Sequence, residues 1–195
     1  MAARGRARRE LRDPRVLRAM AHPFRLRLLD LIVRRGTLTS AEAAKATGEN
    51  TGSCSFHLRQ LAKYGFIEPA EARDGRERRW KRAEGGERIP DQLPPEATRA
   101  ASEAMKVVLD RSFAEIVAWL DSFDELPRQW QRGAVADEEL LYLTPAELRE
   151  LSHEVVALLA RHRKRTTNPS LRPSGSRPIR AFAALVPAAN LEQPS

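Results

Sequence analysis

The stretch ENTGSCSFHLRQLAKYGFIE, from Glu49 to Glu68, decides the fold that we expect for this chain. Asn50 can cap a helix, because its side chain accepts a hydrogen bond from a first-turn N–H group that has no partner inside the helix. Three apolar residues then recur at helical spacing and predict the buried face: Cys54, Leu58 and Leu61. Gly65 is typical of a helix end. The sequence therefore predicts a helix from Asn50 to Tyr64 with a polar front end.

Three shorter helices are expected before this one. Asp13 can cap the first of them, and the proline that follows it suits the first helical position. The apolar pattern of residues 22–36 predicts a second helix that ends at a glycine. Residues 39–48 are rich in alanine and predict a short third helix, with Thr39 or Ser40 as its cap.

A hairpin is expected directly after the polar-fronted helix. Residues 66–70 and 77–81 have the patterns of strands, and Asp74-Gly75 between them is a strong signal for a tight turn. Four arginines edge this hairpin: Arg73, Arg76, Arg78 and Arg79. The sequence thus predicts a positively charged hairpin beside the helix.

Charge is divided unevenly along the 195-residue chain, whose formal net charge is +8. Residues 1–90 contain 21 basic and 11 acidic residues, whereas residues 91–165 contain 10 basic and 14 acidic ones. A basic surface attracts polyanions, because neutralised phosphates release their counterions. We therefore expect the front half to bind a polyanion and the second half to serve another purpose.

The order of helix, helix, short helix, polar-fronted helix and hairpin is that of a winged helix-turn-helix domain. The segments AHPFRLRLLDLI, SCSFHLRQLAKYGFIE and GRERRWKR, with the alanine-rich helix that ends at Gly48, resemble the ArsR-type transcriptional regulators. This resemblance covers roughly residues 15–82. It implies a dimeric bacterial repressor whose recognition helix enters the major groove of double-stranded DNA and whose wing lies along the backbone.

The residues that we expect to contact DNA lie on the recognition helix and in the wing. Free N–H groups at a helix start suit a phosphate or a base edge, and Arg59 can reach guanine or phosphate. We interpret His57 as a residue that packs between helices or bonds a phosphate. Replacing Arg59 should reduce sequence discrimination, whereas replacing Arg76 should weaken binding to all DNA about equally. The predicted contacts are Asn50, Thr51, Gly52, Ser53, Ser55, Phe56, His57, Arg59, Arg73, Arg76 and Arg78.

The pattern of a metal sensor is not expected. Many ArsR-type proteins bind metals through cysteines near the short helix, or through histidine and carboxylate ligands on the terminal dimer helix. The single cysteine, Cys54, fits a small buried hydrophobe instead, and no histidine occurs between His57 and His153. Glu150 and His153 have a spacing found in carboxylate metal sites, but a single copy fits a solvated helix face better. We therefore expect no metal and no cofactor.

A long amphipathic helix is predicted from Pro95 to Phe123, and we expect it to pair with its symmetry mate in a homodimer. Its predicted apolar side contains Met105, Leu109, Phe113 or Ser112, Ile116, Leu120 and Phe123. A capping box at Thr144 and Glu147 predicts a further helix with heptad-like leucine spacing. Five aromatic residues form a core here or line a pocket for a small apolar effector: Phe113, Trp119, Phe123, Trp130 and Tyr142. A protein partner is the alternative to such an effector.

The predicted fold class is mainly α (α+β), a winged helix-turn-helix domain followed by long C-terminal helices, in a dimer. We divide the chain into a disordered basic arm (1–12), a winged-helix DNA-binding domain (13–92), a helical dimerisation region (93–165) and a linker with a tail (166–195). Within the tail, residues 179–186 either form a terminal strand or remain unfolded.

Several functional classes are not expected from the sequence. The longest apolar run is far shorter than the ~20 residues that a membrane span needs, and a single cysteine fits a reducing cytoplasm. No P-loop or Gly-x-Ser-x-Gly motif occurs, so we expect no enzyme and no catalytic residues. One alternative to a DNA-binding regulator stays open: a winged-helix module that binds RNA or a protein, with the acidic C-terminal half as its contact surface.

Overall fold

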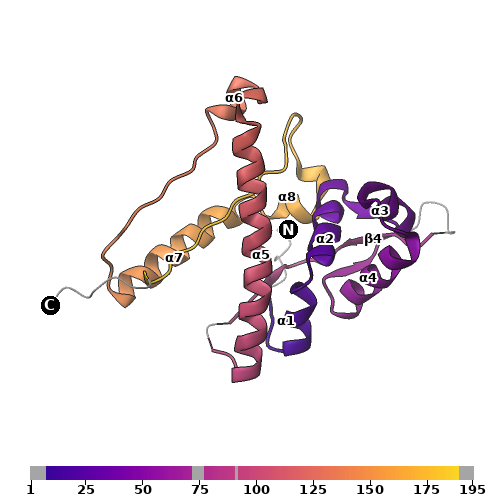
Figure 1. Ribbon diagram of the computed structural model, residues 1–195, viewed down its shortest axis with the longest axis horizontal. Coiled ribbons are helices and arrows are strands. Elements are labelled where there is room, and N and C mark those ends of the chain that lie inside the picture. Colours follow the sequence, from indigo (N-terminus) through magenta and orange to yellow (C-terminus); the bar gives the residue numbers. More distant parts are fainter. Residues whose placement is uncertain (1–7, 72–76, 91, 189–195) are drawn as a thin grey trace, which may run out of the picture.

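The computed structural model describes residues 8–71, 77–90 and 92–188 of the chain. The chain is mainly helical, and its front part forms a winged helix-turn-helix domain (Figure 1). A long helix, α5 (Pro95–Asp121), runs past this domain. In Figure 1 the helices of the domain lie on one side of α5, and the later helix α7 (Pro145–Ala160) lies on the other. The predicted fold class, a winged domain followed by C-terminal helices, is confirmed.

Four helices build the domain: α1 (Pro14–Met20), α2 (Pro23–Arg35), α3 (Ser40–Thr47) and α4 (Thr51–Lys63). Their starts follow the predicted cap chemistry. Asp13 accepts a hydrogen bond from a first-turn N–H group of α1, and Thr39 forms a capping box with Glu42 at α3. Asn50 Oδ1 accepts from the Ser53 N–H group at 2.7 Å and caps α4.

A three-stranded antiparallel sheet joins these helices, in the order β2 (Thr37–Leu38), β4 (Trp80–Arg82) and β3 (Ile67–Pro69). The two hairpin strands were predicted, although β4 begins at Trp80 rather than at residue 77. The strand β2 was not predicted, because two residues are too few to show a period. Leu38 is fully buried there and pairs with Trp80, so β2 closes the sheet against α2.

The amino-terminal arm corrects one expectation. Disorder was predicted up to Arg12, but Arg9 and Glu10 form β1 (Arg9–Glu10), which pairs in parallel with β5 (Glu87–Arg88). Leu11, the next residue, is buried in the core. The buried Leu11 and an ion pair between Glu10 and Arg88 hold residues 9–11, while residues 1–7 of the predicted arm lie outside the described residues. Because the paired residues are 78 positions apart, no local pattern could reveal the contact.

Helix α5 packs against α1 through small side chains. Four alanines form its buried face, together with Ser112 further along: Ala97, Ala100, Ala101 and Ala104. The apolar side predicted from larger residues is mostly not the buried one, since Met105, Phe113 and Leu120 are exposed. Alanines allow the two helix axes to approach closely, so α5 uses its small-residue face against α1 and leaves its larger apolar residues outside.

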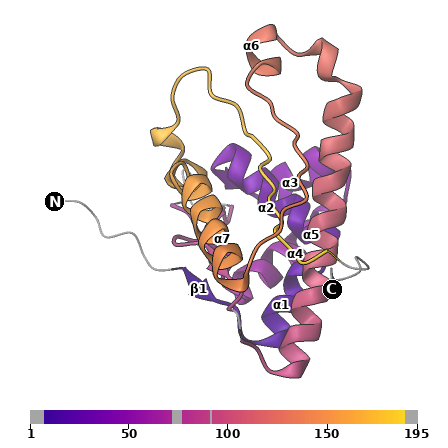
Figure 2. The same ribbon diagram turned by 90° about the vertical axis from the view of Figure 1, so that its left-hand side faces the viewer.

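The chain after α5 is less closely packed. It contains η1 (Phe123–Glu125), α6 (Arg128–Gln131), α7, α8 (Lys164–Thr167) and η2 (Pro169–Leu171). The capping box of Thr144 and Glu147 opens α7 as predicted, but no residue of α7 is buried, and the helix lies apart from α5 (Figures 1 and 2). None of the helices in the described ranges has the length and apolar character needed to cross a bilayer.

The predicted linker, residues 166–178, lies against the domain. Arg172 donates hydrogen bonds to the main-chain oxygens of Val33 and Arg34 at the end of α2. Residues 179–186 form no strand; this segment returns to α5, where Phe182 lies 6.1 Å from the ring of Phe113.

The buried face of α4 yields a stability prediction. Leu58 is fully buried, so Leu58→Ala should lower the free energy of unfolding by about 2–5 kcal/mol, through lost burial and a residual cavity. Arg59 lies on the exposed face of the same helix, and Arg59→Ala should change the free energy of unfolding by less than about 0.5 kcal/mol. Chemical denaturation of both variants measures the difference. Equal losses in the two variants would contradict the assignment of the buried face.

Candidate nucleic-acid interface

Most of the predicted contact residues on α4 lie on its outward side. Thr51, Gly52, Phe56 and Arg59 are exposed, and Ser53, Ser55 and His57 are partly exposed. The opposite stripe is closed, because Cys54, Leu58 and Leu61 are all fully buried. Packing of this stripe fixes the rotation of α4 about its axis, and so fixes which side chains face solvent.

The start of α4 offers main-chain donors that have no acceptor in the part of the chain that the structure describes. The first intrahelical hydrogen bond runs from the Cys54 N–H group to the Asn50 oxygen at 3.1 Å. The Thr51 and Gly52 N–H groups precede it and have no acceptor inside the helix. Gly52 also keeps this end narrow, since a Cβ there would lie 3.3 Å from Asn50 Oδ1. Such a helix start can receive a phosphate oxygen or a base edge.

Arg59 lies in the middle of the outward side. Its Nε donates to the Ser55 main-chain oxygen at 3.3 Å, and it has no acidic partner among the described residues. Its terminal N–H groups are therefore available to a ligand. Phe56 is 51% exposed beside it and adds an apolar contact surface.

The wing is described only at its base. Arg73 and Arg76 lie outside the described residues. Arg78 is exposed, with its guanidinium carbon 5.3 Å from the centre of the Trp80 ring. Arg79 is engaged elsewhere, because it pairs with Glu42 at 2.5 Å and donates to Thr37 Oγ1 at 3.1 Å.

The Arg79 contact ties the wing to the helix-turn-helix. Burial acts to raise the pKa of Glu42, but hydrogen bonds from the Thr39 N–H group and Arg79 lower it below the usual value overall. Glu42 therefore stays ionised at neutral pH, and it serves both as part of the α3 capping box and as the partner of the wing strand. The sequence predicts Arg79 on the basic edge of the hairpin, and its pairing with Glu42 was not predicted.

His57 packs against a histidine that the sequence did not single out. Its ring centre is 4.7 Å from that of His22, and it makes edge contacts with Phe24 and Phe56. The Nδ1 atoms of both histidines are buried without a hydrogen-bond partner among the described residues. Burial, and then the nearby Arg25 charge, lower the pKa of His22 below its ordinary value. The only feature of the sequence that pointed to His22 is its position directly before Pro23, where it stands at the N-cap of α2.

The same causes act on His57. Burial contributes most, followed by the charges of His22 and Arg25, and together they lower its pKa despite the opposing charge of Glu49. Both imidazoles are therefore neutral at pH 7. The packing role predicted for His57 is present in the structure, and it joins the recognition helix to the start of α2.

The five aromatic residues expected to share a core or a pocket do not gather in one place. Trp119 packs edge-on against Phe123, with ring centres 5.4 Å apart, while Tyr142 is 83% exposed. A groove of about 650 Å³ lies instead between α2, α3 and α5. Its apolar lining includes Phe24, Leu31 and Val107.

Two arginines bind one aspartate beside this groove. Arg111 of α5 and Arg180 of the C-terminal segment both pair with Asp30 of α2, at 2.9 and 2.8 Å. Arg180 also pairs with Glu115 at 2.7 Å, and its hydrogen bonds lower the pKa of that carboxyl group. The network joins the domain, the long helix and the tail.

Comparison with known proteins supports the fold of the front half. Residues 20–70 match a family model described as a helix-turn-helix domain. The match spans α2 to β3 and ends before the wing strand. The comparison with curated proteins found no match to the chain. The matched domain is of the winged-helix kind and indicates a DNA-binding regulator in general.

The histidine pair yields a pH prediction. A histidine whose pKa is lower in the folded state stabilises the fold above its unfolded pKa of about 6.5, and this contribution is lost as the pH falls. The free energy of unfolding should therefore decrease from pH 7.5 to pH 5.5. Denaturation curves of His57→Gln should show a smaller decrease. His153→Gln, an exposed site on α7, is the control; equal pH dependence in both variants would refute the assignment.

Proposed function

We propose that the chain is a sequence-specific DNA-binding transcriptional regulator, a repressor, whose helix α4 enters the major groove. The observation that carries this proposal is the division of α4 into a buried stripe and an outward side with free N–H groups, hydroxyl groups and Arg59. The helix-turn-helix match and the basic front half support it. Helix-turn-helix domains are typically not enzymes, which agrees with a binding function, and we propose that the regulator acts in the cytoplasm.

The wing is proposed to follow the DNA backbone. Arg78 is exposed at its base, and Arg73 and Arg76 belong to it by sequence. Arg79 is left out of the proposed contacts, because Glu42 already holds its charge. Phosphate contacts of this kind set the register of the protein on DNA but carry no sequence information.

The regulator is proposed to bind as a homodimer through α5. Four large apolar residues of α5 are 43–56% exposed: Met105, Phe113, Val117 and Leu120. A second copy would cover this surface. A two-fold dimer also presents two recognition helices to half-sites about 34–36 Å apart.

The groove between α2, α3 and α5 is proposed to receive the small apolar effector. Its volume, about 650 Å³, is within the range of small-molecule sites. A ligand there would contact both α2 and α5, and so could change how the domain sits on the dimer helix. Ligand-induced shifts of melting temperature, followed by release of bound DNA, test this part of the proposal.

The first experiment is DNase footprinting of DNA upstream of the protein's own gene at two salt concentrations. A short protected pseudo-palindrome that persists at the higher salt supports a dimeric operator complex. Competition with RNA separates this function from an RNA-binding module. Diffuse protection that salt removes, and that RNA competes away, would count against the proposal.

Two arginine variants should separate base reading from backbone contact. Arg59→Ala should reduce the difference in binding free energy between operator and random DNA by about 1–3 kcal/mol, because a base contact is lost. Arg78→Ala should weaken both DNAs about equally and lower the salt slope by about 1. Fluorescence anisotropy over a salt series measures both quantities. The same loss pattern in both variants would contradict the division of roles.

The proposed dimer surface gives a further prediction. Val117→Glu places a charge on the exposed apolar side of α5, where it should oppose burial against a second copy. We expect monomers in sedimentation analysis and weaker operator binding. Ala118→Glu changes the neighbouring exposed position on another face of the helix and should leave the dimer intact. A Val117→Glu protein that remains dimeric would exclude this surface.

A further inference from the structure

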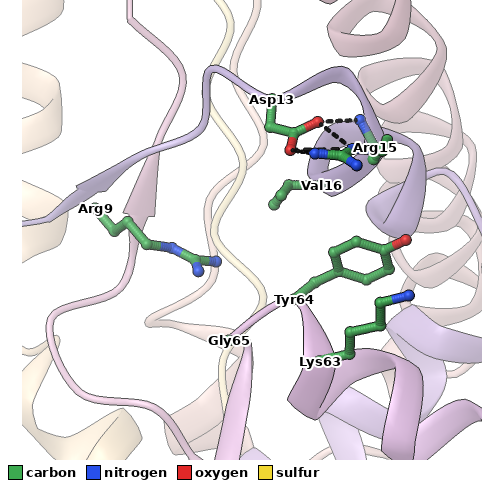
Figure 3. Close-up of a pocket in the computed structure, with 7 residues that line it drawn as sticks. All are labelled: Arg9, Asp13, Arg15, Val16, Lys63, Tyr64 and Gly65. Carbon is green, nitrogen blue, oxygen red and sulfur yellow. Dashed lines mark hydrogen bonds and ion pairs between the residues drawn. The ribbon is translucent and has the colours of Figure 1, made fainter.

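A second pocket lies at the far end of α4, where that helix meets β1 and the start of α1 (Figure 3). Its volume is about 380 Å³. Seven residues line it, of which three are cationic and one is anionic: Arg9, Asp13, Arg15, Val16, Lys63, Tyr64 and Gly65. Neither the DNA contacts nor the effector groove proposed above include this pocket.

Arg9 is held in place at the pocket by main-chain and ring contacts. Its N–H group donates to the Gly86 oxygen at 3.0 Å, and its guanidinium carbon lies 5.3 Å from the centre of the Phe66 ring. Gly65 makes room for the guanidinium, because a Cβ there would lie 2.5 Å from Arg9 Nη1. Gly65 also has a φ of +69°, which favours glycine. Figure 3 shows the Arg9 side chain extending into the space in front of Gly65.

The charges around the pocket are not balanced. Arg15 is neutralised by Asp13, which it contacts at 2.9 Å, and hydrogen bonds from Arg15 lower the pKa of Asp13. Arg9 and Lys63 have no acidic partner among the described residues, and the Lys63 ammonium lies 5.6 Å from the centre of the Tyr64 ring. Two exposed positive charges are therefore left without a counter-ion among the described residues at the wall of this pocket.

The end of α4 does not oppose an anion strongly. Three of its last main-chain oxygens already accept hydrogen bonds from the N–H groups of Tyr64, Gly65 and Phe66. Lys63 further offsets the negative end of the helix dipole. The positive side chains therefore dominate the pocket.

We propose that this pocket binds a phosphate-bearing ligand. The planar guanidinium of Arg9 suits paired hydrogen bonds to phosphate oxygens, and Lys63 supplies a second positive charge on the other side of Tyr64 (Figure 3). A ligand with more than one phosphate can engage both cations. Electrostatics and geometry favour this chemistry over an apolar ligand.

Two sources can supply these phosphates. One is the DNA backbone, since Lys63 continues the outward side of α4 at helical spacing from Phe56 and Arg59. This source rests on the proposed function. The other is a free phosphorylated compound, which a pocket of this volume can accommodate.

Calorimetry with inorganic pyrophosphate, at constant ionic strength and without DNA, tests the free ligand. The full chain should bind it, and Arg9→Gln and Lys63→Gln should each lower the affinity at least about tenfold. Arg149→Gln removes an exposed cation from α7 and should have no effect. The same variants are then measured on random duplex DNA over a salt series.

If DNA is the source, Arg9→Gln and Lys63→Gln should each lower the salt slope by about 1, whether or not pyrophosphate binds. The proposal is overturned when pyrophosphate does not bind and both variants match Arg149→Gln on DNA. If the protein binds pyrophosphate but does not bind DNA, the pocket proposal is supported and the proposed function is contradicted. If Arg59→Ala loses discrimination between DNAs but Arg9→Gln changes neither pyrophosphate binding nor DNA binding, the proposed function is supported and the pocket proposal is overturned.

Discussion

Burial of one stripe of α4 orients the whole front half of the molecule. Cys54, Leu58 and Leu61 lie against the core, and a helix has 3.6 residues per turn, so this contact determines the direction of every other side chain on α4. The polar front end is exposed because its back is anchored. Asn50 then caps the helix without using the N–H groups of Thr51 and Gly52. Stability and presentation of the candidate contact surface thus depend on the same three residues.

A second constraint connects this half to the rest of the chain. Asp30 and Glu115 balance Arg111 and Arg180, so the half-buried network carries no net charge. Removing one partner would leave an uncompensated charge in a poorly solvated place, which is usually more damaging than never forming the pair. The network therefore works as a unit. It makes the position of α5 relative to α2 sensitive to the C-terminal segment, although that segment is remote in sequence.

Local chemistry was predictable from the sequence, and non-local pairing was not. The caps at Asn50, Thr39 and Thr144 follow rules that involve only a few neighbouring residues, and all three are present. The prediction of the buried face of α5 was wrong. Alanine is a weak hydrophobe, and its burial stabilises a helix contact only where the neighbouring helix packs closely against it. The sequence pattern of α5 does not predict that α1 is the helix that packs against it.

The candidate site divides in the same way. The outward side of α4 follows from helical periodicity alone, so its residues could be named in advance. The role of Arg79 depends on Glu42, the packing of His57 depends on His22, and the position of Arg9 depends on Gly65. Each of these pairs brings together separate elements, and only the folded chain determines them.

The pairing of the amino terminus with later segments imposes an order on folding during synthesis. Helices α2 to α4 and the sheet of β2, β4 and β3 contact one another within residues 23–82. The strand β1 needs β5, and α1 needs the alanine face of α5, which leave the ribosome only afterwards. The segments β1 and α1 are therefore translated before α2 to α4 but dock after them. A chain interrupted before α5 would keep its helix-turn-helix core but leave α1 without its main support.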